Sequence, residues 1–202
     1  VLSRNVPAVT VAGNLRDPTF YEFLKKSGIR AMRSAEHYGL ATVLGGVEVT
    51  MRELAGLYVA LANDGVHAPL RYLESEPQAE GRRLFSREAA EIVLEMLRNN
   101  PRPGHGYDEG WAADAVPVAW KTGTSGAFRD AWSAGVFGPY VLVVWIGNFD
   151  GQGNPEFVGR TAAGPLLFEI IDAVRTHHGN LPPAPVFGLS KVKRVPVCAV
   201  SG

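Results

Sequence analysis

The sequence predicts an α+β domain in which an antiparallel sheet is packed with helices. Three observations favour this class: helical periodicity before residue 100, three strand-like segments between residues 116 and 149, and a helical segment at 161–174. The 202 residues are 46% hydrophobic and 20% charged, which is ordinary globular usage. A chain of this length can bury a sizeable core without disulfides or metals.

Two helices are predicted in the first half of the chain from their end signals. Asp17-Pro18 predicts a helix start, with the carboxylate as N-cap and proline at the first helical position, and Gly28 predicts its end. Thr50 and Glu53 predict a capping box for the second helix, which ends near residues 63–65.

The third helix and the strands follow from residue type and spacing. A helix is expected from Ser86 to Arg98, and its inward-facing residues are expected to be Ile92, Val93, Met96 and Leu97. Residues rich in Val, Trp and Tyr predict strands at 116–121, 131–137 and 140–149. Gly138-Pro139 is expected to turn the second strand into the third as an antiparallel hairpin, and a last helix is expected at 161–174.

Composition divides the chain and excludes several classes of function. Residues 1–178 are expected to belong to one domain, and the proline-rich, basic residues 179–202 to be a linker out of it. Lys plus Arg and Asp plus Glu are 20 each, which argues against nucleic acid partners and against a polybasic membrane contact. The longest apolar run is far shorter than the roughly 20 residues of a membrane span.

Metal, disulfide and cofactor chemistry receive no support from the residue pattern. The one cysteine, Cys198, excludes an internal disulfide and a thiolate cluster. The five histidines show no metal-ligand spacing, so a metal site is not expected.

Lys121-Thr122-Gly123, followed by Thr124, is the most informative short motif. At a strand edge, Gly123 permits close approach of a substrate backbone, Lys121 supplies a positive charge, and the hydroxyls of Thr122 and Thr124 can bind a carboxylate. The N–H of Thr124 points to where an oxyanion can form. The alternative is a tight turn that ends a strand.

Ser3-Arg4-Asn5 is the second motif, an S-x-N. The hydroxyl of Ser3 can relay a proton while the amide of Asn5 holds a peptide carbonyl. In isolation the tripeptide is better explained by a polar cap or turn. An S-x-N before a K-T-G strand, with helices between them, makes up two of the three motifs of active-serine, penicillin-recognising proteins.

The longer sequence around these motifs resembles a known family. The segment KTGTSGAFRDAWSAGVFGPYVLVVWIGNFDG is similar to the transpeptidase domain of class A, bifunctional penicillin-binding proteins, and WKTGTS with FRDAW most resembles the 1C subgroup. The segment GLATVLGGVEVTMRELAGLYVALANDGV resembles the helical region before the K-T-G strand of this family. The similarity spans about residues 1–175 and implies that residues 1–178 are the C-terminal portion of such a transpeptidase domain. The tail, residues 179–202, resembles the linker toward an additional C-terminal domain.

This resemblance implies a fold of the penicillin-binding and β-lactamase type and a D,D-transpeptidase that cross-links peptidoglycan. Stem peptides and β-lactam antibiotics are the implied partners, and the outer face of the bacterial inner membrane is the implied location. The implied catalytic residues are Ser3, Asn5 and Lys121, and the implied substrate-binding residues are Thr122, Gly123 and Thr124. A glycosyltransferase domain is implied elsewhere in the protein, and no metal or organic cofactor is implied.

The chain departs from the family pattern at the nucleophile. The family places an S-x-x-K with the active serine before the S-x-N, and nothing precedes Ser3-x-Asn5 here except two residues. The one literal match, Ser190 to Lys193, lies in the proline-flanked tail without helical periodicity. We therefore expect a fragment that is inactive alone.

Two alternatives stay open at this stage. A serine β-lactamase shares S-x-N and K-T-G, but it needs a carboxylate and a water for deacylation, and no clear counterpart is visible. A non-catalytic binding or sensor module would retain the groove and lack the S-x-x-K. The sequence upstream of Ser3 distinguishes these possibilities.

Overall fold

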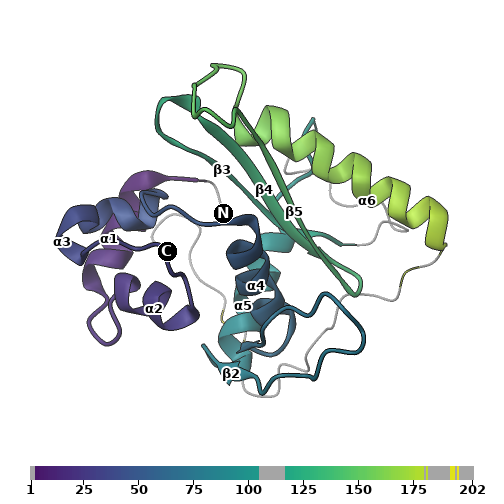
Figure 1. Cartoon of the computed structure of the whole chain (residues 1–202), viewed down its shortest axis with the longest axis horizontal. Helices are drawn as coiled ribbons and strands as arrows, with labels where there is room; N and C mark the ends of the chain where they lie inside the picture. Colours follow the sequence, from purple (N-terminus) through teal and green to yellow (C-terminus); the bar gives the residue numbers. More distant parts are fainter. Residues whose placement is uncertain (1–2, 105–116, 180, 182–191, 194, 196–202) are drawn as a thin grey trace.

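The computed structural model describes residues 3–104, 117–179, 181, 192, 193 and 195. Its main sheet is antiparallel, in the order β3 (Ala119–Thr124), β4 (Asp130–Phe137) and β5 (Tyr140–Gly147). The helix α6 (Gly164–His178) covers one face, while α4 (Met51–Ala62) and α5 (Arg87–Arg98) cover the other (Figure 1). The predicted α+β class is confirmed. The predicted linker lies almost entirely outside the described residues.

Alternation along the strands divides the core between the two faces of the sheet. Trp120, Val144 and their neighbours pack against Leu167, Phe168 and Ile171 of α6. On the other face, a second cluster joins residues of α5, β3 and β4, namely Leu94, Leu97, Ala119 and Val136. The sheet is therefore buried on both faces, which fixes β3 in position.

The strands are close to their predicted bounds, with one informative difference. The strand β3 continues to Thr124, so Lys121, Thr122 and Gly123 lie inside a strand and not at its end. Gly123 pairs with Trp132, and Phe137 pairs with Tyr140 across the Gly138-Pro139 turn, as expected for a hairpin. The final helix begins earlier than predicted, in the segment Gly159–Ala163, a short π-helix.

The first of the two helices predicted for the first half of the chain begins two residues later than expected. The helix α2 (Phe20–Ser27) begins after Thr19 and not after Asp17, because Thr19 and Glu22 form a capping box. The N–H of Thr19 donates to the Glu22 carboxylate (2.8 Å), a reciprocal bond that the Asp17 prediction did not include. The predicted end at Gly28 is confirmed, with φ at 102°.

Three more helical elements complete the N-terminal part. The helix α1 (Asn5–Asn14), which was not predicted, lies beside the 3₁₀ segment Gly39–Leu44, and α3 (Ala35–Tyr38) precedes that segment. A buried cluster of Leu24, Ile29, Tyr38 and Val47 joins this part and packs against Leu57 of α4. The N-terminal helices therefore pack against α4, one of the two helices that cover the face of the sheet opposite α6.

The predicted inward face of α5 is wrong for three of its four residues. Ile92, Val93 and Met96 are exposed, Met96 by 53%, and only Leu97 is buried as expected. The buried face is formed by Ala90, Glu91, Leu94 and Leu97. The fully buried residue Ala90 has a small side chain. The face of α5 that packs against its neighbours is therefore the one that allows close approach, and not the one with the largest apolar side chains.

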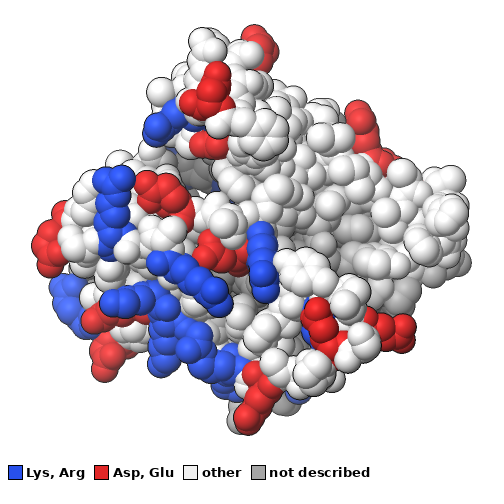
Figure 2. Space-filling model, viewed as in Figure 1, with Lys and Arg blue, Asp and Glu red and all other residues white. Residues whose placement is uncertain are grey.

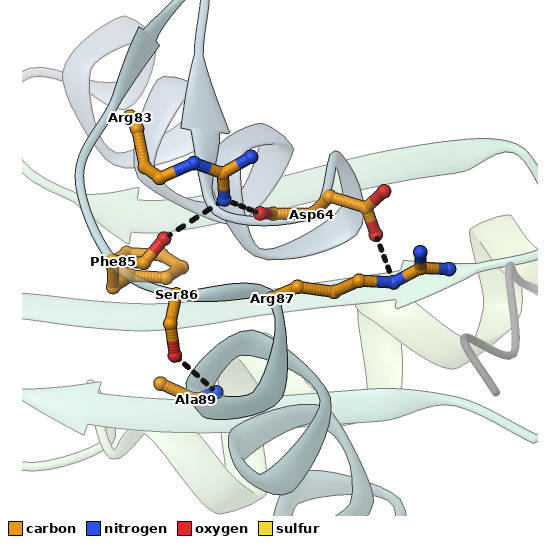
Figure 3. A network of polar contacts seen from close by, with 6 residues as sticks. All are labelled: Asp64, Arg83, Phe85, Ser86, Arg87 and Ala89. Carbon is orange, nitrogen blue, oxygen red and sulfur yellow. Dashed lines mark hydrogen bonds and ion pairs between the residues drawn. The ribbon is translucent and has the colours of Figure 1, made fainter. Parts of the chain in front are cut away.

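A polar network joins the end of α4 to the start of α5 (Figure 3). The guanidinium of Arg83 donates to the backbone oxygens of Asp64 (2.6 Å) and Phe85 (3.3 Å). Arg87 forms an ion pair with the Asp64 carboxylate (3.4 Å), and Ser86 caps α5. These contacts connect α4 and α5, the two helices that cover the face of the sheet opposite α6.

Figure 2 shows how charge is distributed on one face of the molecule. Most Lys and Arg side chains of this face lie over the helical part and toward β2 (Arg82–Arg83), with Asp and Glu among them. The area over the sheet and α6 carries few charges. In the described part of the chain, no helix has the length and apolar character needed to cross a bilayer.

Candidate active site

The open edge of β3 forms the candidate site. In the described part of the chain β3 pairs with β4 and with no other strand. The N–H of Ser125 donates to the carbonyl of Asp130 (3.0 Å), which fixes the phase of the ladder. Hydrogen-bonded and non-bonded pairs alternate, so the N–H and C=O groups of Trp120, Thr122 and Thr124 point away from β4. A substrate backbone can bind these groups.

Asn100 covers the first part of this edge. The amide of Asn100 donates to the carbonyl of Trp120 (3.3 Å), and the indole N–H of Trp120 donates to the carbonyl of Asn100 (2.8 Å). Both residues are buried. The edge that is free to bind a substrate therefore begins at Thr122.

The structure brings Lys121 and Ser3 together. The Lys121 ammonium donates to Ser3 Oγ at 2.5 Å and to the carbonyl oxygen of Thr122 at 2.7 Å. Ser3 has a φ of 54° and does not cap α1, whose N-cap position is Arg4, without a side-chain cap. The S-x-N and K-T-G motifs, 118 positions apart from Ser3 to Lys121, thus meet at the strand edge.

The surroundings of Lys121 weaken its hold on a proton. Burial lowers the pKa of Lys121 below its usual range, and the nearby positive charge of Arg160 lowers it further. A lysine with a lowered pKa exchanges protons near neutral pH more readily than a free lysine. Ser3 Oγ is the hydroxyl best placed for that exchange.

Asn5, the other residue of the S-x-N motif, is the first residue of α1 and is exposed. Within the described residues its side chain makes no hydrogen bond. The structure thus leaves this amide available to solvent, and it does not join Asn5 to Lys121 as it joins Ser3.

Thr124 is held by a residue that the sequence did not indicate. The N–H of Gly159 donates to Thr124 Oγ1 at 2.9 Å, so the threonine hydroxyl is free to donate its own proton. A Cβ at Gly159 would lie 2.4 Å from the carbonyl oxygen of Gly123 and 2.9 Å from that of Trp132. Only glycine permits this approach, and no sequence signal links positions 159 and 124.

Gly123 has no comparable packing reason to be glycine. A Cβ there would meet only Trp132 Cβ, at an ordinary 3.7 Å. Packing against the described residues therefore does not explain why this position is glycine. Thr122 is half-buried and lies one position beyond Lys121 on the same strand.

The turn after Thr124 is fixed by polar contacts. Arg129 Nε donates to the carbonyl of Gly126 (3.2 Å), and Asp130 Oδ1 accepts the indole N–H of Trp145 (2.9 Å). Trp145 packs beside Trp132, with ring centroids 6.3 Å apart. These contacts give Arg129 and Asp130 a structural role in the turn.

Two other features considered in the sequence, a metal site and the literal S-x-x-K match, add no described residue to the candidate site. In the part of the chain that the structure describes, no three histidine, cysteine or acidic side chains are grouped to hold a metal. Ser190, the serine of the literal S-x-x-K, lies outside the described residues.

Comparison with known proteins places these residues in context. Residues 1–161 match the family described as the penicillin-binding protein transpeptidase domain. Over 186 residues, the chain is 32% identical to penicillin-binding protein 1C of Escherichia coli, covering 92% of the chain and 24% of that protein. It is 31% identical to penicillin-binding protein 1A of Aquifex aeolicus, covering 86% of the chain and 26% of that protein.

Penicillin-binding protein 1B of Escherichia coli is a further relative, 30% identical over 162 residues, which are 74% of the chain and 19% of that protein. The chain therefore spans about a quarter or less of the length of these relatives.

Proposed function

Because the chain belongs to the penicillin-binding protein transpeptidase domain family, we propose that the protein is a peptidoglycan D,D-transpeptidase. The observation that carries this proposal is the contact between Lys121 and Ser3 at 2.5 Å, beside a strand edge that is open to a peptide. The proposed substrates are stem peptides ending in D-Ala-D-Ala, and β-lactams would acylate the same site. The proposed location is the outer face of the bacterial inner membrane.

In the proposed reaction a serine oxygen attacks the carbonyl carbon of the penultimate D-Ala. The C–N bond to the terminal D-Ala breaks, and this D-Ala leaves as an amine that has taken up a proton. An amine of a neighbouring strand then attacks the acyl-enzyme, which forms the cross-link and restores the serine hydroxyl. This chemistry needs no metal or organic cofactor.

Each residue at the edge has a proposed role. Ser3 Oγ accepts a hydrogen bond from Lys121, so its own proton is directed elsewhere, and we assign it to the departing amine. The exposed amide of Asn5 is proposed to hold the stem peptide. The hydroxyls of Thr122 and Thr124 are proposed to bind the terminal carboxylate, and the Thr124 N–H, which points away from β4, to form half of the oxyanion hole.

The nucleophile is proposed to be a serine of an S-x-x-K motif upstream of Ser3 in the gene. The chain's coverage of only 24% of the related 1C protein supports this part of the proposal. Residues 1–202 alone are then expected to be inactive.

The test is the intact mass of the protein, expressed from its whole gene, after incubation with benzylpenicillin. A single stable adduct is expected, and residues 1–202 alone should stay unmodified. An adduct on residues 1–202 would contradict an upstream nucleophile. Rapid loss of the adduct with release of hydrolysed penicillin would favour a β-lactamase, and no adduct at all would favour a binding module.

A pair of lysine variants tests the site itself. Lys121→Met should slow acylation by at least about 100-fold, because it removes the proton-exchanging group and its bond to Ser3. Lys25→Met, at an exposed position of α2, is the matched control and should acylate at the rate of the natural protein. Equal rates for both variants would overturn the assignment of Lys121.

A further inference from the structure

Arg160 lies along the face of β3 that carries the two threonines. Side chains alternate along a strand, so Trp120, Thr122 and Thr124 lie on the same face. The N–H of Gly159 bonds to Thr124 Oγ1 at 2.9 Å, which places the backbone of the next residue, Arg160, beside Thr124. The guanidinium carbon of Arg160 lies 5.9 Å from the centroid of the Trp120 ring. The arginine side chain thus runs from the backbone beside Thr124 toward the Trp120 ring, on the strand face that also carries Thr122.

The Arg160 guanidinium packs on the Trp120 ring, and no acidic side chain among the described residues forms an ion pair with it. Trp120 has 0% exposure, and its ring is held by the bond to Asn100, so the arginine lies on a rigid surface. Within the described residues Arg160 makes no hydrogen bond or ion pair, and its side chain is half-buried. A guanidinium over a ring still has donors at its edges, which suit a planar anion.

A second cation lies on the same strand. Lys121 follows Trp120, and the charge of Arg160 is one of the two causes that lower the pKa of Lys121. The positive charges of Lys121 and Arg160 repel each other, and a bound anion would reduce this repulsion. The edge of β3 is therefore electrostatically prepared for a negatively charged ligand.

We propose that Arg160 binds the terminal carboxylate of the substrate, together with the hydroxyls of Thr122 and Thr124. This inference rests on the proposed transpeptidase function, and it assigns Arg160 as a specificity-determining residue. The site would select acyl donors that end in a free carboxylate, and it would discriminate against the same donors as esters or amides.

The experiment compares benzylpenicillin with its carboxylate methyl ester on the protein expressed from its whole gene. Acylation rates at low ligand concentration are measured by intact mass for the natural protein, Arg160→Gln and Arg160→Lys. Arg160→Gln should slow acylation by benzylpenicillin at least about tenfold more than acylation by the ester, because it removes one charge-assisted contact to the carboxylate, whereas any effect on the protonation of Lys121 is common to both ligands. Arg160→Lys should recover part of the rate with benzylpenicillin.

The ester distinguishes this role from others. A loss that affects both ligands equally would show that Arg160 acts on folding or on the protonation of Lys121, and it would overturn the proposal. An unchanged rate with benzylpenicillin would overturn it too. Absence of acylation in the natural protein would instead refute the transpeptidase function on which the inference rests.

Arg52→Gln is the matched control for these variants. Arg52 belongs to α4 and also lies over an aromatic ring, that of Tyr72, at 5.1 Å. Its replacement should leave both rates unchanged. A selective loss of benzylpenicillin acylation in this variant as well would attribute the effect to net charge and would contradict a specific role for Arg160.

Discussion

Trp120 and Asn100 exchange two hydrogen bonds, one from the indole to the backbone and one from the amide to the backbone. The pair ties the segment after α5 to β3 at the residue directly before Lys121. The position of the candidate site along the strand edge therefore depends on a contact between a buried side chain and a loop.

Asn100→Ala should destabilise the fold by about 1–3 kcal/mol, because it leaves the buried carbonyl of Trp120 without its donor. The measurement is the free energy of unfolding in urea. The control is Asn99→Ala, at the exposed neighbouring position, which should change stability by less than about 0.5 kcal/mol. Equal effects at the two positions would contradict the role of this contact.

Gly159→Ala should destabilise the protein by about 1–3 kcal/mol and slow acylation by benzylpenicillin. The new Cβ would lie 2.4 Å from the Gly123 carbonyl oxygen, so the segment must move away from Thr124. Gly126→Ala, where no atom lies within 4 Å of an added Cβ, provides the control and should behave as the natural protein does. A stable, fully active Gly159→Ala protein would show that the close approach is not needed.

Replacing the glutamate of each capping box by alanine is expected to lower the stability of the fold by different amounts. Glu53 accepts from the N–H of Thr50 (2.9 Å) and also from the N–H of Arg30 (3.0 Å), whereas among the described residues Glu22 bonds only to Thr19 at its own helix start. Glu53→Ala should therefore be about 1 kcal/mol more destabilising than Glu22→Ala. Urea unfolding of the two variants measures the difference, and the reverse order would refute this explanation.

Acid should destabilise the fold through His67. Burial lowers the pKa of His67 below its usual 6.5, and the positive charge of Arg82, whose strand β2 pairs with the short strand β1 (Val66–His67), lowers it further. The unfolded chain then binds a proton at a higher pH than the folded chain does. The contribution to stability is complete above pH 6.5 and is lost as the pH falls from there through the folded pKa.

Urea unfolding at pH 8 and pH 5.5 tests the role of His67. His67→Gln should show a smaller loss of stability between these two conditions than the natural protein. His177→Gln, at an exposed position of α6, should retain the loss that His67 causes. An unchanged pH dependence in His67→Gln would exclude this histidine as the cause.

Local signals in the sequence predicted most of the fold. Thr50 with Glu53, Gly28 and Gly138-Pro139 act within a few residues, and each has the predicted role. The buried face of α5 was not predictable in this way, since it depends on which residues fit against α4 and β3. Asp17 failed as a cap because Thr19 offers a reciprocal bond with Glu22.

The candidate site, too, was predictable from the sequence only in part. The motifs containing Ser3 and Lys121 are visible in the sequence, but their contact depends on the fold of everything between them. Gly159 and Arg160 belong to no motif, and their place beside Thr124 follows only from how the last helix begins on the sheet. Contacts of this kind have no sequence spacing that indicates them.

Lys121 has a consequence for the solubility of the protein as well. A strand edge with unpaired backbone groups is a template on which other chains can aggregate. Here Asn100 takes up the carbonyl of Trp120, and Lys121 turns its ammonium back onto the carbonyl of Thr122. The carbonyls of Trp120 and Thr122 are therefore already hydrogen-bonded, and within the described residues the edge offers a full-length strand of another protein fewer acceptors than a continuous ladder would need.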